Sequence, residues 1–190
     1  MSELFEVLAK DHAEVKQMLA ELEAGPTASS GAGSRDLSTR KKMVEQLVIQ
    51  ESKHEALEEM FFWPAVREKL PDGDKLAGTA IGQEQEGKDV LDKLDKLEAD
   101  DAKFEKLVTK FIEAGRTHIT YEETRVWPPL RNALSAEEAS QIGTKIEQGK
   151  KAAPTRPHPH TPPSPGVLKS AGPAAAAADR ARDKATGRGE

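Results

Sequence analysis

Apolar residues recur at helical spacing along most of the chain, up to about residue 149. In the first stretch, Leu4, Leu8, Val15 and Leu19 share one face of a helix. Stripes of the same kind predict four long helices, at residues 3–23, 38–70, 74–98 and 102–126. The sequence GPTASSGAGS between the first two is rich in small and polar residues, which predicts a flexible loop.

Four such helices joined by modest loops predict an all-α fold, an up-down-up-down four-helix bundle. Pro128 and Pro129 are expected to end the fourth helix, because proline lacks an N–H group and clashes with the preceding turn. A short fifth helix is predicted to begin at Ser135, where Ser-Ala-Glu-Glu resembles a capping box. The bundle domain is therefore predicted to span residues 1–150.

Residues 151–190 differ in composition from the rest of the chain. Seven of the twelve prolines lie between Pro154 and Pro173, and an alanine-rich stretch without an apolar face follows. We expect this Pro/Ala-rich tail to be disordered. The tail carries a net charge of +4, which leaves −9 for residues 1–150. So acidic a body argues against binding nucleic acid, because phosphate groups would repel it.

Further classes of protein are excluded by what the sequence lacks. It has no cysteine, so disulfides and thiolate metal sites are ruled out, and a metal site must use histidine and carboxylate ligands. No stretch approaches the roughly 20 apolar residues of a membrane span. The first residues lack the basic and apolar regions of a signal peptide. We expect a cytoplasmic monomer that does not bind membranes.

Each apolar stripe is interrupted by ionisable residues that point at the axis of the predicted bundle. Burying such groups without partners would cost several kcal/mol each, so something must compensate them. A pair of metal ions would do so, since His-x-x-x-Glu places two ligands one turn apart on one helix face. The six candidate ligands are His12, His54, Glu58, Glu84, His118 and Glu122.

An internal repeat supports a site made from two halves. Residues 54–70 align with residues 118–134 at an offset of 64, and the aligned histidines and glutamates of the two His-x-x-x-Glu-Glu motifs match. The first and third helices align at an offset of 72, which sets His12 against Glu84. A helix pair used twice suits a dinuclear centre.

Several neighbours of these residues have plain structural interpretations. Trp63 and Trp127, each followed by proline, are expected to close the ends of the bundle. For Glu55, Glu59, Glu86 and Glu123, a solvated position and a contact with the ligands both stay open. Gly87 aligns with Val15, and the missing side chain is explained either by a small ligand cavity or by close helix packing.

The sequence resembles the hemerythrin-like, or HHE cation-binding, domain family. The resemblance rests on DHAEVKQMLAEL, on His-x-x-x-Glu followed by FFWP, and on His-x-x-x-Glu followed by VWPPL, and it covers residues 1–134. It implies a four-helix bundle with two non-haem iron ions, joined by an oxo or hydroxo bridge. Family members bind oxygen reversibly, sense oxygen or iron, handle nitric oxide, or decompose peroxide. By match, the ligands are His12, His54, Glu58, His118 and Glu122.

Glu84 departs from the family, which usually has a histidine at this point of the third helix. An additional carboxylate stabilises ferric over ferrous iron and favours activation of oxygen or peroxide over oxygen carriage. Three functions stay open: an iron protein that reacts with or senses oxygen, peroxide or nitric oxide; a peroxide-decomposing or ferroxidase-like di-iron enzyme; and a structural, stress-related bundle with adventitious metal. Zinc or manganese could also occupy these ligands.

Overall fold

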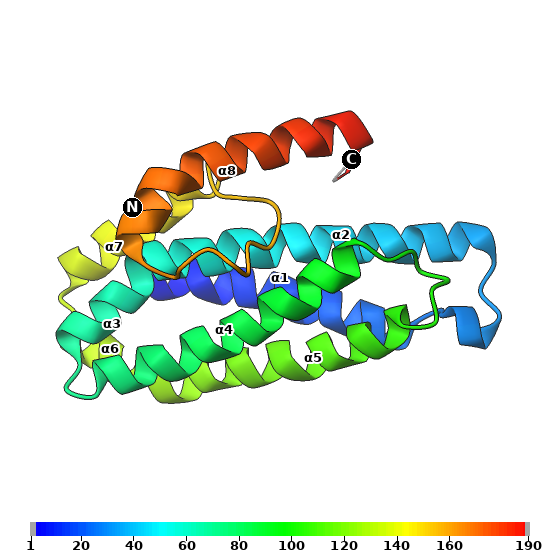
Figure 1. Ribbon diagram of the computed structural model, residues 1–190. Coiled ribbons are helices and arrows are strands. Elements are labelled where there is room, and N and C mark those ends of the chain that lie inside the picture. The colour runs from blue at the N-terminus through cyan, green and yellow to red at the C-terminus, as the bar shows by residue number, and fades with distance from the viewer. Residues whose placement is uncertain (1–2, 189–190) are drawn as a thin grey trace.

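A computed structural model describes residues 3–188 and confirms the all-α bundle. Within these residues every regular element is helical. The four long helices lie side by side in Figure 1, and α3, α6 and α7 gather at one end of them. The bundle helices are α1 (Leu4–Ala24), α2 (Ser34–Leu57), α4 (Gly73–Asp95) and α5 (Phe104–Tyr121).

Two of the four helices continue through a wider turn into a short helix. After α2 come the π-helical segment η2 (Glu58–Phe62) and α3 (Trp63–Lys69). After α5 come the π-helical segment η3 (Glu122–Val126) and α6 (Trp127–Ala133). In each segment the backbone N–H of the tryptophan donates to the backbone carbonyl of the glutamate five residues earlier, which is the hydrogen-bond spacing of a π-helix.

The expectation that Pro128 and Pro129 end the fourth helix is wrong. Both lie in the first turn of α6, which follows η3 without a break. Proline is tolerated there because the first N–H groups of a helix have no partner within it. The π-helical segment η3 thus joins the first turn of α6 directly to the end of α5.

The remaining connections lie close to their predicted places. A 3-10 turn, η1 (Ala28–Ser30), interrupts the glycine-rich loop, and α2 begins four residues earlier than predicted, at Ser34. The fifth helix, α7 (Ala136–Gly149), begins as predicted: Ser135 and Glu138 form a capping box, each side chain accepting from the backbone N–H of the other. This helix packs against α1.

The core is divided along the bundle axis. One apolar cluster lies at the end that holds both tryptophans and includes Leu8 of α1. The other lies toward the opposite end and includes Val15 of the same helix. His12 stands between them, so the polar residues of the interior occupy a layer that apolar side chains seal on both sides.

The expected disorder of residues 151–190 stays a prediction, and the structure describes one more helix within them. Helix α8 (Pro165–Thr186) lies along α2 in Figure 1 and contacts η2. Polar anchors hold it: Asp95 of α4 pairs with Arg156 at 2.8 Å and with Arg188 at 2.7 Å. Leu168 of α8 is buried. The division into domains at residue 150 stays a prediction.

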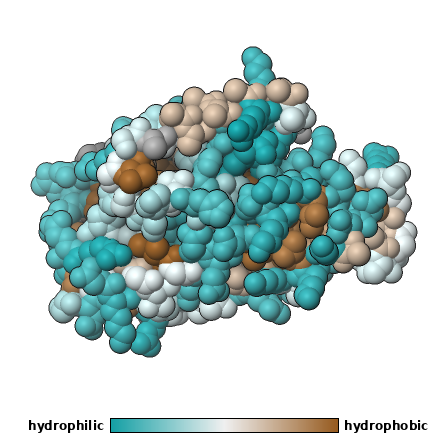
Figure 2. All heavy atoms as spheres, in the orientation of Figure 1, coloured by the Kyte–Doolittle hydropathy of each residue, from teal (hydrophilic) through white to brown (hydrophobic). Residues whose placement is uncertain are grey.

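The face of the molecule drawn in Figure 2 is mainly hydrophilic. Figure 2 shows hydrophilic side chains over most of one face of the bundle, with the paler alanines of α8 along its upper edge. Among the described residues, no helix combines the length and the apolar character that crossing a membrane requires.

Candidate metal centre

The six predicted ligands meet in one buried layer between α1, α2, α4 and α5, where η2 and η3 begin. Their donor atoms form two groups, in each of which all atoms lie within 4.8 Å of one another. We call His12, His54, Glu58 and Glu122 the first donor group, and Glu58, Glu84, His118 and Glu122 the second donor group. Because Glu58 and Glu122 belong to both, the arrangement has the form of two positions joined by two carboxylates.

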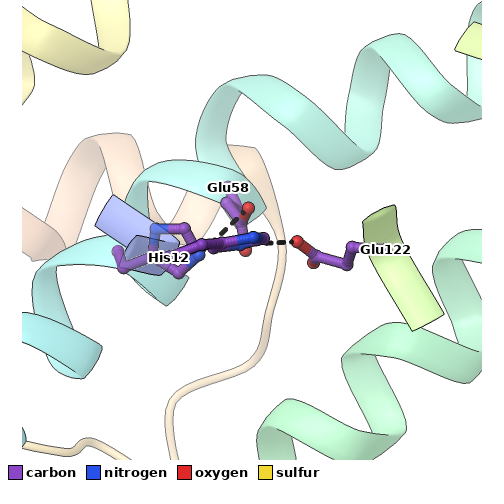
Figure 3. A group of neighbouring side chains, drawn as sticks. His12, Glu58 and Glu122 are labelled. Atoms are coloured by element: carbon purple, nitrogen blue, oxygen red, sulfur yellow. Dashed lines mark ion pairs between the residues drawn. The ribbon is translucent and has the colours of Figure 1, made fainter. Parts of the chain in front are cut away.

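The contacts follow from helical spacing and from the symmetry of the repeat. His54 Nε2 lies 3.3 Å from Glu58 Oε1, and His118 Nε2 lies 3.2 Å from Glu122 Oε1. Each of these pairs is one turn apart on its own helix. His12 Nε2 reaches Glu122 Oε2 across the bundle at 3.1 Å. In Figure 3, His12 and Glu122 point toward each other, with Glu58 beside them.

Within the described part of the chain, these donor atoms lack hydrogen bonds of good geometry despite their close approach. The unpartnered atoms are the Nε2 atoms of His12, His54 and His118, both carboxylate oxygens of Glu58 and Glu122, and Oε2 of Glu84. A buried polar atom without a partner costs about 1–3 kcal/mol. Nitrogen and oxygen donors at this spacing fit a pair of divalent ions, which would satisfy all of them together.

The pKa values of the buried glutamates are shifted by burial and by their charged neighbours. Burial raises the pKa of Glu58 and of Glu84 well above the ordinary value, and neighbouring carboxylates raise the pKa of Glu58 further. Burial also tends to raise the pKa of Glu122, but the imidazoles of His118 and His12 outweigh it and lower that pKa. Protons therefore occupy part of this layer when no metal is bound, and metal binding would release them.

Glu123 lies behind His12 rather than on a solvated face alone. Its Oε1 lies 3.0 Å from His12 Nδ1, and Lys16 Nζ donates to the same carboxylate at 2.7 Å. The repeat places the same pair in the other half, where Lys88 donates to Glu59. The sequence left two interpretations of Glu123 open, and the structure favours the one in which Glu123 contacts the candidate ligand His12.

Two partners of the other histidines were missed by the sequence analysis. Asp11 Oδ2 lies 3.6 Å from His54 Nδ1, which is too long for a hydrogen bond but close enough for electrostatic attraction. Gln83 Oε1 lies 3.2 Å from His118 Nδ1. Asp11 and Gln83 align at the same offset of 72 that pairs His12 with Glu84. The repeat could therefore have revealed them.

The sequence predicted that the two tryptophans close the ends of the bundle, but both lie in the apolar cluster at one end, and each also contacts a candidate ligand. The indole N–H of Trp63 donates to Glu84 Oε1 at 2.5 Å. The ring of Trp127 stacks on His12, with ring centroids 4.9 Å apart and planes inclined by 18°. Each tryptophan thus holds the candidate ligand contributed by the opposite helix pair. The two tryptophans occupy equivalent positions in the repeat. Their partners are also equivalent in position but differ in kind, because His12 aligns with Glu84.

Two further carboxyl groups lie beside the layer. For Glu55 the sequence left open a solvated face and a contact with the ligands; only 3% of its surface is exposed, and Glu51 is also buried. Burial raises the pKa of each to about 8. This burial is hard to predict from the sequence, because an isolated glutamate on a charged helix is usually solvated.

Comparison with known proteins agrees with this geometry. The family model "Hemerythrin HHE cation binding domain" matches residues 3–130. An uncharacterized hemerythrin-like protein of Schizosaccharomyces pombe is 26% identical over 184 residues, covering 96% of this chain and 86% of that protein. The crystal structure of a hemerythrin HHE cation-binding domain-containing protein from Mycobacterium kansasii has the same fold, with a TM-score of 0.63 and 19% identity, over 80% of this chain and 86% of that one. The chain belongs to the hemerythrin HHE cation-binding domain family.

Proposed function

We propose that the chain holds two iron ions, one in each donor group, with Glu58 and Glu122 shared between them. The observation that carries this proposal is the shared pair of buried carboxylates, whose oxygens all lack hydrogen-bond partners within the described residues. Three imidazoles and three carboxylates are a donor set that suits iron. The family match supports a cation site but names no metal.

We further propose that the centre reacts with dioxygen or peroxide instead of carrying oxygen. Glu84 supports this direction, because its buried side chain belongs to the second donor group. Two ferrous ions carry +4, and three ionised carboxylates supply −3, which favours the ferric state more than a site with an additional histidine would. Iron would supply the electrons for reduction of the bound molecule.

The protein itself supplies orientation and exclusion of water. Glu123 holds the ring of His12 through Nδ1, so Nε2 faces the donor layer. The indole of Trp63 holds one oxygen of Glu84 and leaves the other without a partner. The apolar clusters on both sides of the layer keep bulk water from a reactive centre.

Metal analysis of protein purified without a histidine tag tests the proposal, together with an optical spectrum before and after addition of peroxide. We expect close to two irons per chain and a spectrum that changes with peroxide. Replacing His54 or His118 with alanine should remove at least one iron. His160→Ala is the control, because this histidine is exposed in the C-terminal segment. Stoichiometric zinc without iron, or no bound metal, would refute the proposal.

A further inference from the structure

A cavity joins the surface of the molecule to the first donor group. Its volume is about 200 Å³, and α1, α2 and the end of α7 supply its walls. The exposed residues Lys10 and Glu147 line it, and so does the buried imidazole of His54. Of the six candidate ligands, His54 alone borders this cavity. The cavity is therefore a path between solvent and one ligand of the donor layer.

Other directions of approach to the donor layer are narrower. Along the bundle axis, the apolar clusters that include Leu8 and Val15 seal the layer. A cavity beside Glu84 and His118 has a volume of about 10 Å³, which is about the room that one water molecule needs. A divalent cation that keeps part of its hydration shell needs more space than that. Of these two cavities, only the larger one has room for such a cation.

The ammonium group of Lys150 closes the larger cavity with two ion pairs. Lys150 Nζ lies 2.6 Å from Asp11 Oδ1 on α1 and 3.1 Å from Glu147 Oε2 on α7. Both carboxylates line the cavity. Carboxylate oxygens are ligands of divalent cations. The ammonium group thus occupies the position between two carboxylates that a cation in transit would take.

Asp11 connects this ion pair to the donor layer. Its other oxygen, Oδ2, lies 3.6 Å from His54 Nδ1. His54 is 7% exposed, and neither of its ring nitrogens has a hydrogen-bond partner among residues 3–188. Carboxylate and imidazole donors thus follow one another from Glu147 at the surface, through Asp11, to the buried ring of His54.

We propose that this cavity is the path by which a divalent metal cation reaches and leaves the first donor group, with Glu147 and Asp11 as ligands in transit and Lys150 as the gate. Lysine has a flexible four-carbon stem, and the Lys150 side chain is 25% exposed, so rotation can carry its ammonium group into solvent. A closed gate slows entry and escape alike, so it changes rates and not affinity. The inference rests on the proposed function, because a metal must occupy the donor layer.

Two variants of the full chain separate the gate from a general effect of charge. Lys150→Gln removes the ion pairs with Asp11 and Glu147 and keeps a polar side chain. Lys10→Gln is the matched control: Lys10 lines the same cavity, and the substitution removes the same charge. The Lys10 side chain is 71% exposed and lies 4.0 Å from Glu14, so solvent and salt screen its charge.

Three quantities are measured without oxygen: the rate at which the metal-free chain takes up Fe²⁺, the rate at which the loaded chain loses it to an excess of a coloured chelator, and the dissociation constant by competition. Lys150→Gln should raise both rates about fivefold or more, the scale of one partly exposed ion pair. Its dissociation constant should equal that of Lys10→Gln. Lys10→Gln should keep the uptake and release rates of the parent.

The same measurements with Zn²⁺ distinguish failure of the gate from failure of the proposed function. If the parent holds iron and Lys150→Gln exchanges it no faster, the gate is refuted and the proposed function stands. A changed release rate with an unchanged uptake rate would also refute the gate, since the effect would then be one on affinity. If the chain takes up zinc but no iron, the proposed function fails, and the zinc rates decide the gate. A chain that binds neither metal would overturn both.

Discussion

Asp11 and Gln83 occupy equivalent positions in the two halves of the bundle, and each faces the outer nitrogen of a histidine in the donor layer. One partner is an anion and the other a neutral amide. A carboxylate behind an imidazole increases its basicity and strengthens its bond to a metal. His54 belongs to the first donor group and His118 to the second, so the two donor groups are electronically unequal.

The first prediction follows from this inequality. Asp11→Asn removes a negative charge behind His54 and should raise the reduction potential of the centre, while Gln83→Glu adds one behind His118 and should lower it. The scale is about 59 mV for each tenfold change in a one-electron equilibrium. Spectroelectrochemical titration of the iron-loaded variants measures both shifts.

Asp89→Asn is the control for charge alone, because Asp89 is exposed on α4. Iron content is measured in parallel, since loss of such a partner lowers metal affinity by about 10–100-fold. Potentials that move in the same direction for Asp11→Asn and Gln83→Glu would contradict the interpretation that these side chains act through their charge.

The second prediction concerns Glu84, which receives the indole N–H of Trp63. Glu84→His removes one negative charge from the second donor group and restores the usual family residue. The reduction potential should rise, and the ferrous protein should oxidise more slowly in air. Glu84→Ala should lower iron content instead, because it removes a donor atom. If neither variant changes the potential, the air-oxidation rate or the iron content, Glu84 is not a ligand.

The sequence was sufficient to predict the bundle because helical spacing and capping are local properties. Leu4, Leu8 and Val15 predict a helix whatever surrounds them, and Ser135 caps α7 through Glu138, three residues away. The convergence of the histidines and glutamates was also predictable, since all of them interrupt apolar stripes. The ligand roles themselves stay predictions.

What the sequence concealed depends on packing between distant segments. Glu55 looks like a surface residue until α4 and α5 cover it. The ion pairs of Asp95 with the C-terminal segment join residues about 60 positions or more apart, so sequence spacing does not reveal them. The π-helical segments were also missed: the predicted second helix runs through Trp63 and Pro64 to residue 70, and the predicted fourth helix ends before Pro128.

The third prediction is a dependence of stability on pH in the metal-free protein. Burial raises the pKa of Glu51 from 4.5 to about 8. Between these values the folded chain binds a proton that the unfolded chain has lost, so the stability contribution is complete below about pH 4.5 and is lost as pH rises through about 8. The slope for one such group is at most about 1.4 kcal/mol per pH unit.

Urea denaturation of the metal-free chain at pH 5, 6, 7 and 8 measures this slope. His54 acts in the opposite sense, because burial lowers its pKa, so the informative comparison is between the parent and Glu51→Gln. The glutamine variant cannot ionise and should lose less stability over this range. Identical slopes for the two proteins would show that Glu51 is already ionised at pH 5.

The fourth prediction concerns the docking of the C-terminal segment. Asp95→Asn removes the pairs of Arg156 and Arg188 to the bundle and leaves only their pairs to Asp183 within the segment, which should release the segment from the bundle. Trypsin should then cleave within residues 151–188 faster than in the parent. Breaking a largely buried ion pair costs about 3–5 kcal/mol, so the cleavage rate should rise at least about tenfold. Asp92→Asn, which breaks an exposed pair with Lys96, should leave the rate unchanged.

The π-helical segments η2 and η3 make the site sensitive to chain length. A π turn holds one residue more than an α turn, so each segment acts as a one-residue insertion in a continuous helical rod. Successive residues of an α-helix are rotated by about 100°. Deleting one residue from η2 would therefore turn Trp63 away from Glu84 while leaving His54 upstream in place. The same deletion in η3 would separate Trp127 from His12. The number of residues in each π-helical segment thus keeps each tryptophan aligned with a candidate ligand from the other half of the bundle.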